Sequence, residues 1–153
     1  MIRMFVIVLS ILLPLPALAL SCAPFEPKDA FRAADDAMEV YHVVHGGLEF
    51  DPAALPETGA REPSGTAVPG WVRGRMLTRE GFTSYVSIPV TLRVQCIGPW
   101  CGHVMPGDDI LMFIENSGEG YFLDVSPCGG MLFPEPSRAD LDAMQSCLRG
   151  GCR

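Results

Sequence analysis

Apolar residues follow three different patterns along the chain. Residues 5–13 form an apolar run that only Ser10 interrupts. Residues 27–36 and 141–148 carry apolar side chains at helical spacing, with polar residues between them. Residues 37–50 are rich in Val and Tyr, and from there to residue 125 Gly and Pro divide the chain into short segments, which is typical of strands.

The N-terminal run has the features of a secretory signal. Arg3 supplies the positive charge before the apolar run, and Ala17-Leu-Ala19 matches the small-residue pattern at which signal peptidase cuts. The run is too short to span a bilayer, although a retained membrane anchor is the alternative. We therefore expect a signal peptide at residues 1–19 and an exported chain that begins at Leu20, in the periplasm or outside the cell.

The two helical patterns have recognisable beginnings. Pro27 suits a first helical turn, and Phe31, Ala34 and Met38 then define one apolar face. Near the C-terminus, Ser137-Arg-Ala-Asp140 resembles a capping box. The apolar face that follows it consists of Leu141, Met144 and Leu148, and Gly150-Gly151 ends the helix. We expect both helices to pack on the sheet.

Five segments predict strands, at residues 37–50, 71–77, 83–95, 109–115 and 121–125. Gly46-Gly47 indicates a bulge or bend in the first of these, and Pro89 requires an edge position or a bulge in the third. Pro127-Cys-Gly-Gly130 is expected to end the sheet. Residues 51–70 contain four prolines and three glycines, which predicts a long flexible loop that is either functional or a tolerated insertion.

Together these elements predict one domain over residues 20–153. Its expected class is mainly β: a small five-stranded OB-type Greek-key barrel, with a short N-terminal helix and a C-terminal helix packed on it. Loss of Arg3 with the signal would change the formal net charge from −7 to −8. Because nucleic acids and anionic membranes require clustered Lys and Arg, we expect neither as a partner, unless lipid is attached at Cys22.

Six cysteines follow the predicted cleavage site, at positions 22, 96, 101, 128, 147 and 152. An even number in an exported chain indicates up to three disulfide bonds, which would stabilise the fold. The cysteines at 96, 101, 147 and 152 are expected to pair either locally, as Cys96–Cys101 and Cys147–Cys152, or between the loop and the C-terminal helix.

One stretch also resembles a known family. The run Cys22-x-Pro24-x-x-Pro27-x-x-Ala30-Phe31-x-x-Ala34-Asp35 is similar to the mature N-terminus of the tissue inhibitors of metalloproteinases, in the netrin-like superfamily. Cys101-Gly102, then Gly107 and a strand, is similar to a later pattern of that family. The resemblance implies an OB-type barrel, a bacterial exported TIMP-like member and a disulfide between Cys22 and Cys128.

The chain also departs from that family. Leu20 stands where the family has its first cysteine, whose amine and carbonyl chelate the zinc of the inhibited protease, and Arg32 stands where another cysteine is found. The resemblance nevertheless implies a candidate binding ridge at the chain start, beside the 96–101 loop. Its residues are Leu20, Ser21, Cys22, Ala23 and Pro24.

The sequence contains only weak indications of a catalytic or metal-binding site. On a strand, His42 and His45 point to opposite faces and cannot chelate one ion together. Cys96, Cys101 and His103 could be zinc ligands, but exported cysteines are usually oxidised. The acids Asp108, Asp109, Glu115, Glu119 and Asp124 do not have calcium-loop spacing and indicate a solvated acidic rim.

The sequence therefore predicts a protein-binding module without cofactor, metal or catalytic residues. One form of this prediction is a protease-inhibitor-like protein that uses the ridge. The other is a non-inhibitory envelope or extracellular protein, which presents the 51–70 loop and the barrel face to a protein partner. Such a protein could also be anchored as a lipoprotein at Cys22, because Ala19-Leu-Ser-Cys22 resembles a lipobox. A small exported enzyme is the third alternative, with no residues nominated for it.

Overall fold

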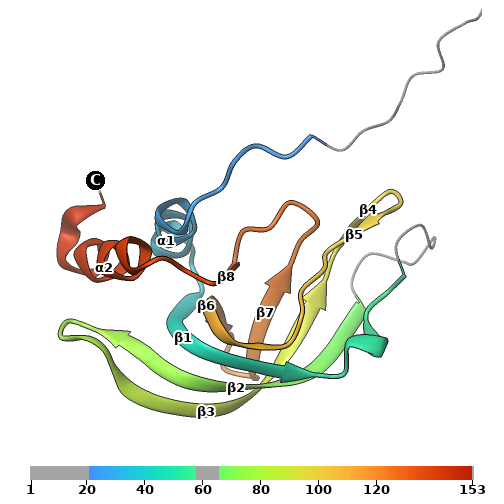
Figure 1. The fold of residues 1–153 in the computed structure, drawn as a ribbon, viewed down its shortest axis with the longest axis horizontal. Coiled ribbons are helices and arrows are strands. Elements are labelled where there is room, and N and C mark those ends of the chain that lie inside the picture. Colours follow the sequence, from blue (N-terminus) through green and yellow to red (C-terminus); the bar gives the residue numbers. More distant parts are fainter. Residues whose placement is uncertain (1–20, 58–65, 153) are drawn as a thin grey trace, which may run out of the picture.

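The computed structural model describes residues 21–57 and 66–152 and is mainly β (Figure 1). In chain order its elements are α1 (Pro27–Asp36), β1 (Val40–Phe50), the 3₁₀ turn η1 (Pro52–Ala54), β2 (Thr66–Thr78), β3 (Gly81–Val94), β4 (Cys96–Ile97), β5 (Trp100–Cys101), β6 (Gly107–Asn116), β7 (Tyr121–Val125), β8 (Leu132–Pro134), α2 (Arg138–Ser146) and the π-helical turn η2 (Cys147–Gly151). The predicted signal at 1–19, and Leu20, lie outside the described residues. Within them, no helix is both long and apolar enough to cross a membrane.

Five strands close into a barrel. β1 pairs with β2, β2 with β3, β3 with β7, β7 with β6, and β6 with β1 again. The β3–β7 pairing is parallel and the other four are antiparallel. This closed order confirms the predicted five-stranded OB-type Greek-key barrel. β4 and β5 form a separate two-stranded hairpin.

The barrel interior is filled by alternate side chains of its strands. Val44 of β1 and Val72 of β2 are fully buried there, as is Met112 of β6. Because successive strand residues point to opposite faces, Leu111 and Phe113 of β6 lie on the outside of the barrel, yet they are fully buried as well. β6 is therefore the central strand of the fold, covered on both faces.

The two helices cover that outer face. Ala30 of α1 and Met144 of α2 are fully buried in one cluster with Phe113, which also contains Val43 of β1 and Leu77 of β2. Figure 1 shows both helices on the same side of the barrel. The predicted packing of both helices is confirmed, and burial of this second apolar cluster ties the chain start and the chain end to the sheet.

The local signals for both helices are confirmed. α1 spans the ten residues that were predicted, with Pro27 in its first turn. At the start of α2 the backbone N–H of Asp140 donates to Ser137 Oγ at 3.2 Å, and the N–H of Ser137 donates to Asp140 Oδ2 at 3.0 Å. This is the reciprocal pattern of a capping box. Gly150 has a φ of 94°, which favours glycine and ends regular helix there.

The irregular strand positions also agree with the sequence. The pairing of β1 with β6 shifts register between Gly46 and Leu48, which is the predicted bulge. A Cβ on Gly46 would collide with the backbone carbonyl of Arg73, so β1 and β2 approach closely there. Pro89 pairs only with β2, because β7 joins β3 from Thr91 onward, and Pro89 thus occupies an edge position.

Some expected boundaries were wrong. The loop expected at 51–70 ends before Thr66, because Thr66–Gly70 belongs to β2 and pairs with Val94–Val90 of β3. Pro69 is tolerated in β2 because the pairing with β1 extends only as far as Gly70. The sheet does not end at Gly130, because β8 pairs with β6 over residues 110–112, where β7 no longer reaches. Met38 is 97% exposed, since α1 ends at Asp36.

Candidate functional site

A disulfide ties the N-terminal segment to the end of β7. Cys22 bonds to Cys128, with their Cα atoms 5.3 Å apart, and Cys128 follows the last residue of β7, Val125, by three positions. The structure thus contains the pair that the resemblance implies. Residues 21–26, which include the ridge residues Ser21, Cys22, Ala23 and Pro24, are irregular and all exposed. The segment is therefore fixed to the barrel without being buried.

The β4–β5 hairpin is anchored at the same place. A local disulfide between Cys96 and Cys101 closes it, with a Cα–Cα distance of 3.9 Å. At its base, the N–H of Gln95 donates to the carbonyl of Val125 at 2.9 Å, and the N–H of Gly102 donates to the carbonyl of Gln95 at 2.8 Å. A Cβ on Gly102 would collide with the Val125 carbonyl. The hairpin and the N-terminal segment therefore converge on the end of β7.

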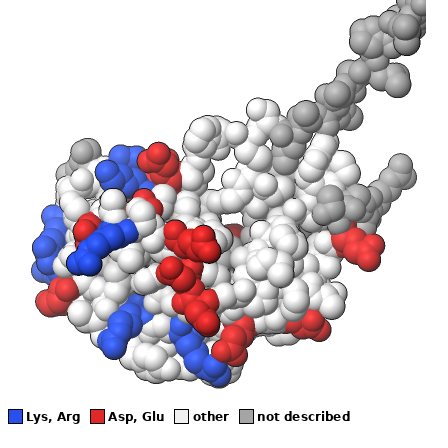
Figure 2. Space-filling model, in the orientation of Figure 1, with Lys and Arg blue, Asp and Glu red and all other residues white. Residues whose placement is uncertain are grey.

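Three chain stretches meet at this end of the barrel, and none contains Asp, Glu, Lys or Arg. They are residues 21–25, 94–107 and 126–134, which we call the uncharged end. This is notable because 19% of the whole chain is charged. In Figure 2 the charged side chains gather over the helices and along the lower edge of the molecule, whereas the upper middle of that face is largely white.

Exposed large apolar side chains occur in two of the three stretches of the uncharged end, 21–25 and 94–107. Phe25 is 41% exposed, Ile97 50% and Met105 58%. None of these three residues carries a reactive group, so no catalytic or metal-binding motif in the sequence includes them. The available signal was the absence of charge over residues 94–107 and 126–134. Apolar surface without charge is the composition of the core of a protein interface.

The two cysteines that could have been zinc ligands at this end are excluded as ligands. Cys96 and Cys101 are bonded to each other, so neither can bind metal as a thiolate beside His103. Within residues 21–57 and 66–152, no group of three His, Cys, Asp or Glu side chains could hold a metal ion. His42 lies 6.0 Å from the ring of Tyr121, whereas His45 bonds to Asp109 at 2.6 Å, which agrees with their predicted opposite faces.

A charged cluster lies elsewhere, on the outer face of β3, β7 and β6. Arg93 donates to both carboxylate oxygens of Asp124, from Nε at 2.7 Å and from Nη2 at 2.9 Å. The same guanidinium is paired with Glu115, and it stacks over the ring of Phe122, with Cζ 5.0 Å from the centroid. Burial alone would lower the pKa of Arg93, but the hydrogen bonds to Asp124 and Glu115 raise it above its ordinary value.

This cluster corrects the expectation of a solvated acidic rim for two of its five acids, whereas Asp108, Asp109 and Glu119 are exposed as expected. Glu115 is only 8% exposed, and it shares the single positive charge of Arg93 with Asp124. Tyr41 lies opposite Glu115 on the neighbouring strand. Desolvation, together with the negative charges of Glu115 and Asp124, raises the pKa of the Tyr41 hydroxyl. Because the charges of the cluster are paired with one another, we interpret it as structural.

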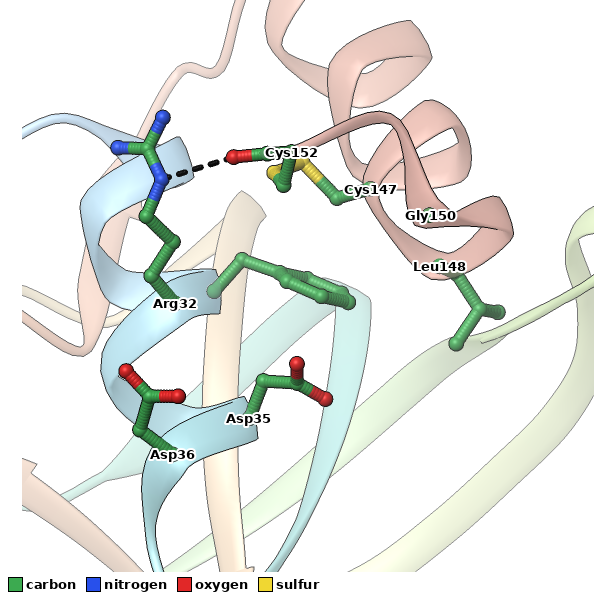
Figure 3. A pocket seen from close by; sticks show the side chains of 8 residues that line it. Arg32, Asp35, Asp36, Cys147, Leu148, Gly150 and Cys152 are labelled. Atoms are coloured by element: carbon green, nitrogen blue, oxygen red, sulfur yellow. Dashed lines mark hydrogen bonds between the residues drawn. A yellow bond between two sulfur atoms is a disulfide. The ribbon is translucent and has the colours of Figure 1, made fainter.

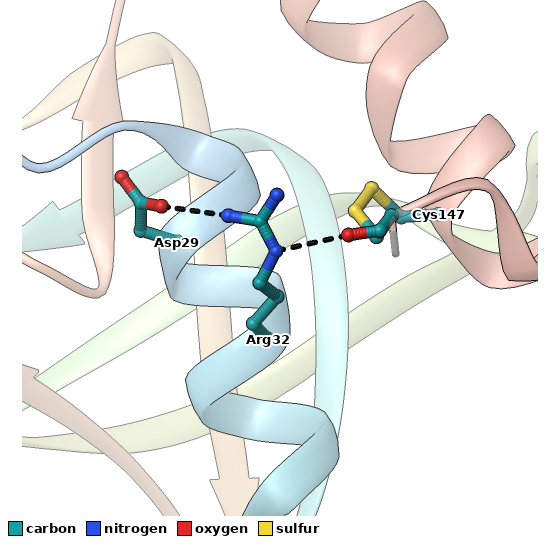
Figure 4. The surroundings of a disulfide bond; sticks show 4 residues. Asp29, Arg32 and Cys147 are labelled. Carbon is teal, nitrogen blue, oxygen red and sulfur yellow. Dashed lines mark hydrogen bonds and ion pairs between the residues drawn. A yellow bond between two sulfur atoms is a disulfide. The ribbon is translucent and has the colours of Figure 1, made fainter.

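A pocket of about 430 Å³ separates α1 from the C-terminal turn (Figure 3). Arg32 spans it, donating from Nε to the carbonyl of Cys152 at 2.9 Å and from Nη1 to Asp29 at 2.9 Å (Figure 4). The disulfide Cys147–Cys152 closes the turn locally. Because the guanidinium is hydrogen-bonded both to α1 and to the C-terminal turn, we interpret this pocket as part of the packing interface between them.

Comparison of the chain with protein-family models, with curated proteins and with solved structures finds no match. Function therefore has to be argued from the geometry of the chain itself. That geometry brings together four ridge residues, Ser21 to Pro24, and the two disulfides Cys22–Cys128 and Cys96–Cys101. It separates them from Cys147–Cys152, which belongs to the helical side. The fifth ridge residue, Leu20, lies outside the described residues.

Proposed function

We propose that this chain is an exported, non-catalytic protein-binding module that binds its partner through the uncharged end. The observation that carries the proposal is the convergence of three uncharged stretches, with exposed Phe25, Ile97 and Met105, on the end of β7. Two disulfides restrain these stretches before any partner arrives. Restraint lowers the conformational entropy that is lost on association, which favours binding.

Export is part of the same proposal. Three disulfides are compatible with an oxidising compartment, either the periplasm or the outside of the cell. A Cys22 that is bonded to Cys128 has no free thiol to carry the lipid that the lipoprotein alternative requires. We therefore favour cleavage before Leu20 over lipid attachment, and a protein partner over a membrane.

We favour binding over catalysis because the paired charged and titratable groups lie outside the uncharged end. Arg93 is engaged by Asp124 and Glu115, and His45 is bonded to Asp109. The uncharged end contributes one titratable side chain, His103. Among the described residues, His103 forms no side-chain hydrogen bond that would orient it for proton transfer.

Two forms of the binding proposal differ in what the chain start does. In the inhibitor-like form, which the family resemblance supports, the segment before Cys22 enters the active site of a zinc protease. The exposed, irregular course of residues 21–24 suits that role. In the non-inhibitory form, the same uncharged end holds an envelope or extracellular partner and the chain start only contributes surface.

Partner capture tests the common proposal. The oxidised protein, isolated after export, is immobilised and exposed to the exported fraction of the cells that make it. Ile97→Asp introduces charge at the uncharged end and should abolish capture of the partner that the wild type retains. Tyr85→Asp is the matched control, because Tyr85 is 67% exposed on β3 and outside the uncharged end. Equal capture by wild type and Ile97→Asp would refute the proposed surface.

Protease inhibition then separates the two forms. The native protein is assayed against a panel of zinc endopeptidases, beside a version that carries one extra residue before Leu20. The inhibitor-like form predicts inhibition by the native protein and none by the extended one, because the α-amine at the zinc must be that of Leu20, which the extra residue converts into a peptide N–H. If the native protein inhibits none of them while capture still succeeds, the non-inhibitory form holds.

A further inference from the structure

A pocket of about 530 Å³ opens beside the uncharged end, between the segment that leaves β5 and strand β8. Its lining includes the apolar residues Val104, Met105, Pro106, Ile110 and Pro134, together with His103 and three acidic residues. Val104 is 5% exposed and Ile110 3%, so the floor belongs to the barrel core, whereas Met105 is 58% exposed. The volume is within the range of roughly 300–1,000 Å³ that is common for ligand pockets.

A smaller pocket of about 60 Å³ continues this one toward the N-terminal disulfide. It shares His103, Val104 and Pro134 with the larger pocket and reaches Ser126 and Gly129, on either side of Cys128. The apolar depression is therefore continuous with the proposed binding surface. A protein partner that covers Phe25 and Ile97 could also place one of its side chains in this depression. A small molecule is too small to contact both regions.

Acidic residues stand at the far rim of the larger pocket. Asp108 and Asp109 follow the uncharged stretch 94–107 directly, and Glu135 follows the stretch 126–134. The N–H of Glu135 donates to the carbonyl of Asp109 at 2.8 Å, so the two acidic segments are held together. Among the described residues neither Asp108 nor Glu135 forms an ion pair, and no Lys or Arg lines either pocket.

We propose that this pocket binds an extended peptide segment of the partner in which a large apolar side chain lies next to Lys or Arg. The apolar side chain enters between Met105 and Pro134, and the cation lies against Asp108 and Glu135. The bound peptide should carry a positive charge, because the rim is acidic and no Lys or Arg lines the pocket. The inference rests on the proposed function, since it specifies the partner chemistry at the same surface.

Selection from a displayed library of random heptapeptides tests this inference on the full oxidised protein. Enriched peptides should combine Leu, Ile, Met or Phe with a neighbouring Lys or Arg. Their affinity should fall about fivefold or more in the double variant Asp108→Asn, Glu135→Gln, and this loss should shrink at high salt, as expected for exposed ion pairs. Asp35→Asn, an exposed acid of α1, is the control and should bind as the wild type does.

The outcomes separate this inference from the proposed function. If no peptide is enriched, if the enriched peptides lack a cation, or if the double variant binds them equally, the peptide pocket is refuted. Partner capture by the wild type, abolished by Ile97→Asp, would still stand in that case. Conversely, peptide binding that follows Asp108 and Glu135 supports the pocket even if Ile97→Asp leaves partner capture unchanged, which would refute the proposed surface alone.

Discussion

Arg93 and Asp124 lie directly opposite each other on the parallel strands β3 and β7 and are joined by two hydrogen bonds. The second carboxylate on the guanidinium, Glu115, comes from β6 and is nearly buried. One arginine therefore connects three strands at the only parallel pairing of the barrel. A buried carboxylate is costly without a partner, so this arginine supports the place where the barrel closes.

Removal of Arg93 should destabilise the protein more than removal of a surface arginine. Arg93→Met keeps much of the apolar stem but leaves Glu115 without a cation, and we expect a loss of about 2–3 kcal/mol in the free energy of unfolding. Arg73→Met is the control, because Arg73 and its partner Glu49 are both more than half exposed, and it should cost less than about 1 kcal/mol. Urea denaturation of both variants measures the difference; equal losses would contradict a special role for Arg93.

Tyr41 should make stability fall at alkaline pH. Its pKa is raised in the folded state, so the folded protein holds the hydroxyl proton where the unfolded chain has begun to lose it. The contribution is complete below the unfolded pKa of about 10 and is lost as the pH rises through the folded value. Urea denaturation should show a smaller alkaline loss for Tyr41→Phe than for wild type. Tyr85→Phe should behave as the wild type does; identical curves for all three would refute the assignment.

The disulfides Cys22–Cys128 and Cys96–Cys101 should differ in how much they stabilise the fold. Cys22–Cys128 spans 106 positions, and replacing both residues by Ser should cost about 4–5 kcal/mol in the chain-entropy view. Cys96–Cys101 spans five positions, and the same replacement there should cost about 2 kcal/mol. Denaturation of both double variants under oxidising conditions gives the ranking. A larger loss for the Cys96–Cys101 variant would show that the disulfide at the N-terminal segment does not stabilise the fold by closing a long loop.

Gly102 should tolerate no side chain. Gly102→Ala places a Cβ against the Val125 carbonyl and should cost roughly 1–3 kcal/mol, because the hairpin base must move away from β7. Gly120→Ala is the matched control, since its Cβ would meet only the ring edge of Phe122 at ordinary contact distance. Thermal unfolding compares the two. A stable Gly102→Ala variant would mean that the hairpin is not seated on β7.

Much of the fold could be predicted because local and periodic signals agreed. The Pro27 start, the Ser137–Asp140 capping box and the Gly46 bulge are each set by a few neighbouring residues, and all are present. β8 could not be predicted, because its three residues pair with β6 only through the return of the chain after Gly130. The early start of β2 was hidden by Pro69, whose tolerance depends on where β1 ends.

The candidate site was predictable only in part. The ridge at Ser21 to Pro24 came from a resemblance, and the structure ties it to Cys128. The partner of Cys96 could not be chosen from the sequence, and the structure pairs it with Cys101. The burial of Glu115 was not predictable, because it depends on Arg93 lying two strands away in space and 22 positions away in sequence. Exposed Ile97 and Met105 carry no reactive group, so no motif in the sequence marks them as part of a site.

The central claim is that a protein partner covers the uncharged end, and photo-crosslinking in the producing cells tests it most directly. A photoreactive amino acid is incorporated at Ile97 in one strain and at Tyr85 in another, and the exported protein is irradiated before extraction. We predict a discrete protein adduct from position 97 and none from position 85. Adducts from position 85 alone, or none from position 97, would contradict the account.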